Sequence, residues 1–363
     1  MGANVRALVM GGTQFNGLAL VKELVKTGHD VTILNRGQSD AVVPRRVNRL
    51  YCDRTDHEKL RETLGRVDFD CVFDISAYRP EDVQLMAEIF RGRIGHYIFA
   101  SSTVIYAASK ILPITENFPL ERGDAQNEYG MNKILCEDIL MREYREQNFP
   151  VSIAAFSMVF GPNNIIPERE QRMFVRIAQG RPVLIPGDGT TVQQIGHVYD
   201  EARALRMMMR KPATLGRRYN LTGGDCYSDE GYVDTFSEVV GRKPEKVFIP
   251  PAMMDDLYSG RIDIRGKSIA PTVDTRTSER NERDARLFQL QRVMQRIAPN
   301  IHGWNNSVWF SIDQLKRDTG WAPEFTFESS VEQTWKWMVE AGLNQTRNFD
   351  FDFEDDLIAR LRG

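Results

Sequence analysis

The first thirty residues contain a glycine-rich turn between a short apolar run and an amphipathic stretch. The run VRALVM ends at Gly11 and Gly12, and Gly17 precedes the stretch LALVKELVKTGHD, whose apolar residues recur at helical spacing. A buried strand that enters a helix through glycines lets the backbone approach a pyrophosphate and aims the helix N–H groups at it. This order predicts a dinucleotide-binding turn, although Gln14 stands where a GxxGxxG pattern has its middle glycine.

Strand and helix signals alternate through the first 160 residues. Further stretches predicted as strands lie at Val31–Gly37, at YCDRTD near residue 52, at Phe69–Ser76, at His96–Thr103 and over residues 151–162. Helical patterns lie between them, one beginning at Pro80 and one spanning Tyr129–Gln147. Alternation at this pace predicts an α/β protein: a Rossmann-type doubly wound parallel sheet with a smaller C-terminal α/β substrate-binding lobe.

The expected organisation has two parts. Residues 1–160 should form an NAD(P)-binding Rossmann domain, to which later segments near 190–224 return. Residues 161–363 should form mainly the substrate-binding lobe. Within it, residues 250–305 look like an atypical insertion with the charged run DTRTSERNERDARLF, to which the sequence assigns no function.

Composition argues against several classes of protein. The formal net charge is −3, which gives no electrostatic basis for binding nucleic acid. No run reaches the roughly 20 apolar residues of a membrane helix. The four cysteines are scattered, without a CxxC pair or a nearby histidine. We therefore expect buried reduced thiols, no metal site, no membrane contact and a cytoplasmic protein.

A phenol and an ammonium lie one helical turn apart in YGMNK, where Tyr129 and Lys133 are at i and i+4. A cation at that distance stabilises a phenolate, which the phenol must form to exchange a proton near neutral pH. Upstream, the segment ASSTVIY puts the hydroxyl of Ser102 at the carboxyl edge of the sheet, where ligands bind in this class of fold. We therefore expect these three residues to form a catalytic group.

The second predicted strand ends in Asn35 and Arg36 and carries no acidic residue there. An acid at this position binds the 2′-hydroxyl of NAD and disfavours the 2′-phosphate of NADP. Arginine can pair with a phosphate through its planar fork, although an exposed arginine in a turn is an equally good interpretation. The pattern favours NADP slightly over NAD.

Taken in order, these motifs resemble the extended short-chain dehydrogenase/reductase superfamily and its NAD(P)-dependent epimerase/dehydratase family. The later segments GDGTTVQQIGHVYDEA, YNLTGG and DTGWAPEFTFESSVEQTWKWM are also similar to that family. The MGGTQFNG and NRG pair is most similar to a sub-branch that includes chloroplast stem-loop RNA-binding proteins. The resemblance spans most of the chain outside residues 250–305. It implies a homodimer built from the helix that carries Tyr129 and the helix after Pro80.

The resemblance also implies roles for individual residues. Lys133 would hold the nicotinamide ribose, Asp53 would lie near the adenine, and AFSMVFGP would line the nicotinamide and the substrate. The candidate cofactor-binding residues are Gly11, Gly12, Thr13, Gln14, Phe15, Gly17, Asn35, Arg36, Asp53, Arg54, Ser76, Ala77, Tyr78, Ser101, Lys133 and Phe156. The candidate substrate-contacting residues are Thr103, Met158, Gln193 and His197, although a structural role is the simpler interpretation for His197.

Departures from the family pattern narrow the chemistry. Thr103 and Val104 stand where sugar-nucleotide 4,6-dehydratases carry an acid pair, so dehydratase chemistry lacks its general acid. Met158 and Gln193 replace a frequent asparagine and a frequent phosphate-binding arginine. The site therefore lacks side chains that commonly bind the diphosphate of a nucleotide sugar. An unusual sugar or a cyclitol-like polyol is an alternative substrate.

The leading hypothesis is an NAD(P)-dependent epimerase or oxidoreductase that acts on a sugar or sugar-like secondary alcohol through a keto intermediate. The sequence does not separate an epimerase from an NADPH-dependent ketoreductase of a biosynthetic pathway. An RNA-binding protein that reuses the fold is a hypothesis of another class. The negative net charge and the intact Tyr129 and Lys133 pair disfavour it, and they make nucleic acid a poor partner.

Overall fold

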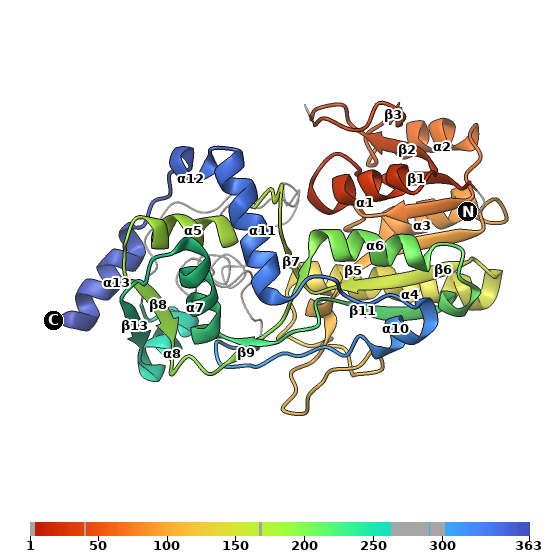
Figure 1. The fold of residues 1–363 in the computed structure, drawn as a ribbon. Helices are drawn as coiled ribbons and strands as arrows, with labels where there is room; N and C mark the ends of the chain where they lie inside the picture. The colour runs from red at the N-terminus through yellow and green to blue at the C-terminus, as the bar shows by residue number, and fades with distance from the viewer. Residues whose placement is uncertain (1–3, 40, 167–168, 263–289, 291–301) are drawn as a thin grey trace.

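Seven parallel strands form the central sheet, in the order β11-β6-β5-β4-β1-β2-β3 (Figure 1). The computed structural model describes residues 4–39, 41–166, 169–262, 290 and 302–363. The sheet strands are β1 (Arg6–Met10), β2 (Asp30–Asn35), β3 (Asn48–Tyr51), β4 (Cys71–Asp74), β5 (His96–Ser102), β6 (Val151–Phe156) and β11 (Arg217–Leu221). The predicted Rossmann-type α/β fold is confirmed.

Helices cover both faces of the sheet. The helices α1 (Phe15–Lys26) and α6 (Val198–Met208) pack together on one face. The other face carries α2 (His57–Gly65), α3 (Pro80–Phe90) and α4 (Glu128–Gln147). Both faces of each central strand are therefore buried, as a parallel sheet requires.

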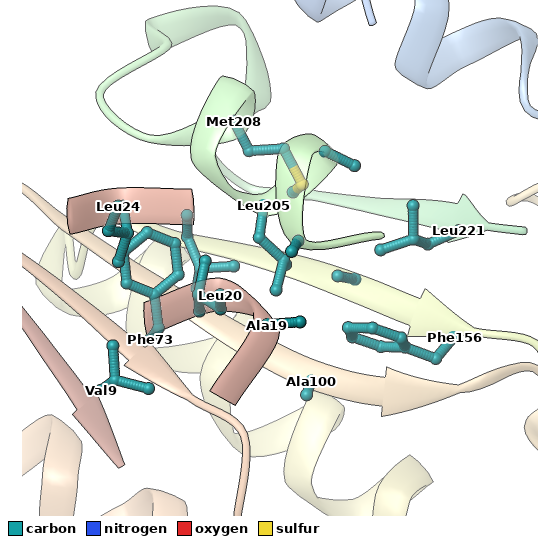
Figure 2. Packing of buried hydrophobic residues seen from close by; sticks show 14 of the residues in the cluster. Val9, Ala19, Leu20, Leu24, Phe73, Ala100, Phe156, Leu205, Met208 and Leu221 are labelled. Carbon is teal, nitrogen blue, oxygen red and sulfur yellow. The ribbon is translucent and has the colours of Figure 1, made fainter. Parts of the chain in front are cut away.

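The sheet residues alternate between two hydrophobic cores. Because successive side chains of a strand point to opposite faces, β1 sends Val9 to the α1/α6 core and Leu8 to the α2/α3/α4 core. Figure 2 shows the first core, in which Leu20 of α1 and Leu205 of α6 pack with Phe73 of β4. These cores hold the strand ends in register at the carboxyl edge.

Two strand predictions differ from the structure in detail. The third strand ends at Tyr51, just before the predicted position near residue 52. The apolar run over residues 151–162 is divided at Ser157 into β6 and β7 (Met158–Phe160). The backbone N–H of Ser157 donates to the carbonyl of Leu221, and β7 then pairs with β10 (Ile195–His197) outside the main sheet. An apolar run does not reveal such a change of partner.

The remaining elements gather beside the sheet, around α5, α7, α8 and α13 (Figure 1). The further strands are β8 (Val183–Pro186), β9 (Val192–Gln193), β12 (Tyr227–Ser228) and β13 (Lys246–Ile249). The further helices are η1 (Thr103–Ile105), α5 (Glu170–Ala178), η2 (Pro212–Thr214), α7 (Asp229–Val240), α8 (Pro251–Ser259), α10 (Asp313–Thr319), α11 (Phe327–Glu340), α12 (Leu343–Thr346) and α13 (Asp352–Arg362). Most of the expected insertion at 250–305 lies outside the described residues.

Three expectations from composition can be compared with the described residues. All four cysteines are free thiols; Cys52, Cys71 and Cys136 are buried, but Cys226 is exposed, so the expectation of burial was wrong for that residue. No helix in the described ranges has the length and apolar character needed to cross a membrane. The same ranges hold no group of three or more His, Cys, Asp or Glu side chains arranged for a metal ion.

Candidate functional site

The glycine turn joins β1 to α1 at the carboxyl edge of the sheet, and two of its positions have no room for a side chain. A Cβ atom on Gly17 would overlap the carbonyl oxygen of Gly11, and a Cβ atom on Gly12 would lie 2.6 Å from the Ile33 side chain. Gly11 has a φ of +90°, and Phe15 has a φ of +34°, which is a strained value for a non-glycine residue. The turn is thus shaped for close approach of the backbone to a ligand.

The N-terminus of α1 is open to such a ligand. Its N-cap residue Gln14 is exposed and its side chain makes no capping hydrogen bond. The first N–H groups of a helix have no intrahelical acceptor, and with the helix dipole they attract an anion. Thr13, in the turn before this helix, is buried, and its N–H donates to the carbonyl of Gly11. These groups would hold the pyrophosphate of a dinucleotide.

The end of β2 offers a buried amide that has no acceptor. The Oδ1 of Asn35 accepts from the N–H of Gly37 at 2.8 Å, while its Nδ2 is buried without a partner among the described residues. Arg36 is exposed next to it. Asp53, after β3, is exposed and accepts from the N–H and the hydroxyl of Thr55. An unpaired amide here suits a ribose hydroxyl, so the residues present fit NAD(P).

Arg54 forms a buried ion pair beneath the turn. Its guanidinium contacts both oxygens of Asp74, at 2.8 and 3.0 Å, and donates to the hydroxyl of Ser76 at 3.0 Å. The hydroxyl of Tyr97 donates to Asp74 at 2.6 Å. Burial works against the charge of Asp74, but Arg54 holds the pKa of that carboxyl below its usual range. Arg54 therefore supports the turn through Ser76, whose Cβ would be 3.0 Å from a Cβ on Gly11.

The three predicted catalytic residues meet where β5 ends and α4 begins. Ser102 is the last residue of β5, Tyr129 lies in the first turn of α4, and the hydroxyl of Ser102 acts to lower the pKa of the Tyr129 phenol. Asn127 caps that turn by accepting from the N–H of Gly130 at 2.7 Å. Lys133 follows one turn later, with its ammonium 5.6 Å from the centre of the Tyr129 ring.

Lys133 is held by backbone oxygens. Its Nζ donates to the carbonyls of Ala77 and Ala100 at 2.7 Å each, and the side chain is 2% exposed. The ammonium also lies 4.9 Å from the centre of the Tyr78 ring. Burial lowers the pKa of Lys133 to about 8. The carbonyl of Ala77 lies in the segment expected along the cofactor, so Lys133 bridges that segment and β5.

The sequence predicts that a nearby cation stabilises the phenolate of Tyr129, but the pKa of this phenol is shifted in the opposite direction. Burial raises the pKa of Tyr129, and the nearby Tyr78 raises it further. Ser102 and the guanidinium of Arg169 act in the opposite direction. In the protein alone, desolvation outweighs these favourable contacts, and the strongest cationic influence on the phenol is a residue that the YGMNK spacing did not indicate.

The other candidate residues occupy both sides of this edge. Ser101 is buried and donates to Glu137 of α4, so its hydroxyl is directed into the helix layer. Phe156 ends β6 and is buried, while Thr103 and Met158 are partly exposed. Gln193 is buried in β9, and its Nε2 has no partner among the described residues. The structure thus gives Ser101 a role in packing and leaves Gln193 with an unused donor.

His197 is held as part of the fold. Its Nδ1 accepts from the N–H of Tyr199 at 3.3 Å and so caps α6. Its ring stacks on Phe325 with centroids 3.8 Å apart, and the residue is 2% exposed. Burial lowers the pKa of His197 to about 4. These contacts match the structural interpretation that the sequence had favoured for this residue.

Sequence reasoning missed two charged residues near this site. Arg169 precedes α5 and interacts electrostatically with both Tyr129 and Glu201. Glu201 is 1% exposed in the first turn of α6. Its position gave a signal, because Val198, Ala202 and Leu205 mark the buried face of this helix and Glu201 lies among them at helical spacing. Nothing in the sequence around Arg169 indicated its place.

The chain is similar to known proteins over most of its length. The profile of the NAD-dependent epimerase/dehydratase family matches residues 7–222, which is more than half of the chain. A chloroplast stem-loop binding protein of 41 kDa from Arabidopsis thaliana is 29% identical over 264 residues, covering 69% of this chain and 67% of that protein. A UDP-glucose 4-epimerase from Mycoplasma pneumoniae is 24% identical, covering 63% and 80%. A 2′-dehydrokanamycin reductase from Streptomyces kanamyceticus is 20% identical, covering 68% and 70%.

Solved structures share the fold. A UDP-glucose 4-epimerase from Thermotoga maritima, solved with UDP-glucose, has a TM-score of 0.69 at 18% identity, covering 92% of this chain and 99% of its own. A dTDP-glucose 4,6-dehydratase from Bacillus anthracis, solved with NAD, also has a TM-score of 0.69, at 16% identity, covering 93% and 97%. The family is described as NAD-dependent and the Bacillus anthracis structure contains NAD, so these comparisons give no support to a preference for NADP. The chain belongs to the NAD-dependent epimerase/dehydratase family.

Proposed function

We propose that this protein is an NAD(P)-dependent enzyme that oxidises or reduces a secondary alcohol or ketone of a sugar-like substrate, as an epimerase or a reductase working through a keto compound. The observation that carries the proposal is the meeting of Ser102, Tyr129 and Lys133 at the sheet edge that also holds the glycine turn. A bound dinucleotide would supply the carbon that accepts or donates hydride. The protein supplies the proton transfer and the positioning.

Each of the three residues has a distinct task in this proposal. The Ser102 hydroxyl holds the reacting oxygen of the substrate, and the Tyr129 phenol exchanges the proton with that oxygen. Lys133 fixes the segment that follows β4 against β5 through its two carbonyl contacts, and it keeps a positive charge near the phenol below a pH of about 8. No carboxylate follows Ser102, because η1 begins directly with Thr103 and Val104, so dehydration remains the less favoured reaction.

Relatives of both kinds support the two forms of the reaction, since UDP-glucose 4-epimerases and a 2′-dehydrokanamycin reductase are both similar to the chain. An epimerase must hold its cofactor through two hydride transfers, whereas a reductase must release it after one. Native mass spectrometry of the purified protein separates these forms. Retained dinucleotide of unchanged oxidation state after turnover supports the epimerase, and exchange at each turnover supports the reductase.

We propose separately that the protein prefers NADP slightly over NAD. This preference is supported by Asn35 and the exposed Arg36 at the end of β2, where no acid would repel a 2′-phosphate. Equilibrium binding of NAD and NADP to wild type and to Arg36→Ala tests it. A loss of affinity for NADP alone supports the proposal, and an equal change for both cofactors contradicts it.

The main test is Tyr129→Phe, which keeps the ring and removes the ionisable hydroxyl. General acid–base groups contribute about 10²- to 10⁴-fold, so kcat should fall by at least about 100-fold on whichever substrate of a nucleotide-sugar, free-sugar and cyclitol panel is turned over. Cofactor binding should be preserved. Turnover by Tyr129→Phe at the wild-type rate would overturn the assignment of this site.

An RNA-binding function is a second candidate, because a stem-loop binding protein is among the relatives. The formal net charge of −3 and the intact catalytic group speak against it. Filter binding to a structured RNA across a salt series is the test. Tight binding that weakens with salt, with affinity unchanged in Tyr129→Phe, would favour this second function.

A further inference from the structure

Among the described residues, no carboxylate pairs with the buried ammonium of Lys133. The side chain is 2% exposed, and within the described ranges its hydrogen bonds are those to the carbonyls of Ala77 and Ala100, at 2.7 Å each. Burial of a charge costs free energy unless other groups replace the lost water. Because an ammonium has three N–H donors, these two bonds leave part of the charge to be stabilised in another way.

Three aromatic rings lie close to this ammonium. The Nζ of Lys133 is 4.8 Å from the centre of the Phe99 ring, 4.9 Å from that of Tyr78 and 5.6 Å from that of Tyr129. A cation within about 6 Å of a ring centre is attracted by the negative charge of the ring face. The rings come from β5, from the segment after β4 and from α4. We call Tyr78, Phe99 and Tyr129 the aromatic cluster.

Tyr78 is the ring of the aromatic cluster that has no other assigned role toward Lys133 or the core. Phe99 is fully buried in the core between the sheet and α2, α3 and α4, and Tyr129 is the proposed proton-exchanging phenol. Tyr78 is partly exposed, and its ring lies beside that of Tyr129, with centroids 6.2 Å apart and planes at 45°. Its centre is closer to the Lys133 ammonium than that of Tyr129. Tyr78 therefore lies next to both members of the predicted i, i+4 pair.

The backbone of Tyr78 is anchored by a group of buried charges. Its N–H donates to Oδ2 of Asp82, in the first turn of α3, at 3.0 Å. The other oxygen of Asp82 lies 3.3 Å from Nε of Arg54, whose guanidinium also pairs with Asp74 at the end of β4. Both carboxylates are buried. The place of the Tyr78 ring is thus set by the same arginine that contacts Ser76 beneath the glycine turn.

We propose that Tyr78 is a positioning residue for Lys133, and that its ring holds the charged ammonium beside the Tyr129 phenol. This inference deepens the proposed function, on which it rests; the family resemblance implies only a cofactor contact for Tyr78. The ring acts through the charge distribution of its face and not through its hydroxyl. Tyr78→Phe therefore preserves the effect, whereas an aliphatic side chain of similar length, as in Tyr78→Met, abolishes it.

Nuclear magnetic resonance of the whole protein tests this without turnover. In protein labelled with ¹³Cε-lysine, the resonance lost in Lys133→Met reports the ammonium, and its titration gives the pKa of Lys133, which is about 8 in the wild type. Loss of the ring face disfavours the charged form, so Tyr78→Met should lower this pKa by at least about half a pH unit. Tyr78→Phe should leave it close to the wild-type value.

Fluorination separates the charge of the ring face from its packing. Trifluorophenylalanine at position 78 keeps the shape of the ring in Tyr78→Phe but removes most of the negative charge from its face. It should lower the pKa of Lys133 as Tyr78→Met does, even if Tyr78→Met folds poorly. As a matched control, Tyr199→Met removes an exposed tyrosine ring at the start of α6 and should leave the pKa of Lys133 unchanged.

The charged or titratable groups that act on Lys133 are Cys136, Asp74, Arg54 and Glu137, and these variants change none of them. The proposal is overturned if the pKa of Lys133 is unchanged in the fluorinated protein, or if Tyr78→Phe lowers it as far as Tyr78→Met. A rise in Tyr78→Met, with water in place of the ring, also overturns it. Because neither substrate nor cofactor is added, these results leave the turnover test of Tyr129→Phe unaffected.

Discussion

The two sides of the sheet's carboxyl edge differ in how their buried charges are satisfied. On the cofactor side, which we define as the ends of β1 to β4 with the glycine turn, the buried charges of Arg54 and Asp74 pair with each other, and Ser76 and Tyr97 hydrogen-bond to them. On the substrate side, defined as the end of β6, β7, β10 and the start of α6, Glu201 is buried without a hydrogen-bond partner among the described residues.

This difference separates buried polar groups that have partners within the protein from buried polar groups that do not. On the cofactor side the paired charges of Arg54 and Asp74 offset each other, whereas the buried Nδ2 of Asn35 has no partner among the described residues and is available to a ligand. The substrate side holds polar groups whose burial costs free energy in the protein alone. Natural sites accept such a cost where function requires it. On the substrate side, Gln193 and Glu201 are residues whose buried polar atoms have no partner among the described residues.

The largest expected effect comes from breaking the cofactor-side network with Arg54→Met. Removal of one partner leaves Asp74 as an uncompensated buried charge, which costs about 3 to 5 kcal/mol of unfolding free energy. Chemical denaturation at neutral pH measures it. The control Arg61→Met removes an exposed pair with Glu88 and should cost less than about 1 kcal/mol. Equal losses in the two variants would contradict the contrast between the two sides.

A pH-dependent effect tests whether Lys133 is charged in the folded protein. Its folded pKa of about 8 lies below the unfolded value of 10.5, so between these values the unfolded state binds more protons and stability rises with pH. The difference in unfolding free energy between wild type and Lys133→Met should therefore change by about 3 kcal/mol, in favour of wild type, from pH 8 to pH 10.5. Denaturation curves across that range measure it, and a constant difference would contradict the lowered pKa.

A matched pair of glycines compares the two sides directly. A Cβ on Gly17 would overlap the carbonyl oxygen of Gly11, and a Cβ on Gly223 would overlap that of Ile195. Each substitution by alanine should cost about 1 to 3 kcal/mol. Only Gly17→Ala, in the turn, should also weaken dinucleotide binding by more than about tenfold, as titration calorimetry can show. Gly65→Ala, where nothing lies within 4 Å of the new atom, is the neutral control. An equal loss of dinucleotide binding in Gly17→Ala and Gly223→Ala would contradict the assignment of the glycine turn as the cofactor-binding element.

The sequence was sufficient for the features that depend on local spacing. The glycine turn, the i, i+4 pair of Tyr129 and Lys133, and Ser102 at a strand end are each set by a few consecutive residues and by the common edge of a parallel sheet. The structure brings them together as expected. Their use in catalysis remains a prediction.

Features that depend on distant partners could not be read in this way. Arg54 was expected at the cofactor, but its partner Asp74 lies 20 residues away and is reached only once β3 and β4 are folded. Arg169 and Glu201 come from different elements, and no pattern links them. The division of the 151–162 run at Ser157 depends on β10, which is three residues long and lies in a later part of the chain. In each case the tertiary fold, and not the local pattern, decides the partner.

The smallest expected effect is an increase in the free energy of unfolding, whereas the effects above are losses. It concerns the buried carboxyl of the substrate side. Glu201→Met replaces a buried, unpaired carboxyl by an apolar side chain of similar length, so it should raise the unfolding free energy by about 1 kcal/mol. The neighbouring Asp200→Asn weakens an acceptor of two backbone N–H groups and should lower it. Thermal and chemical denaturation at pH 7 measure both. If Glu201→Met destabilised the protein as much as Asp200→Asn, the Glu201 carboxyl would have a structural partner. The buried charges of the substrate side would then be paired like those of the cofactor side. A gain in stability together with an altered pH profile of kcat would mark Glu201 as a residue kept for function at the expense of the fold.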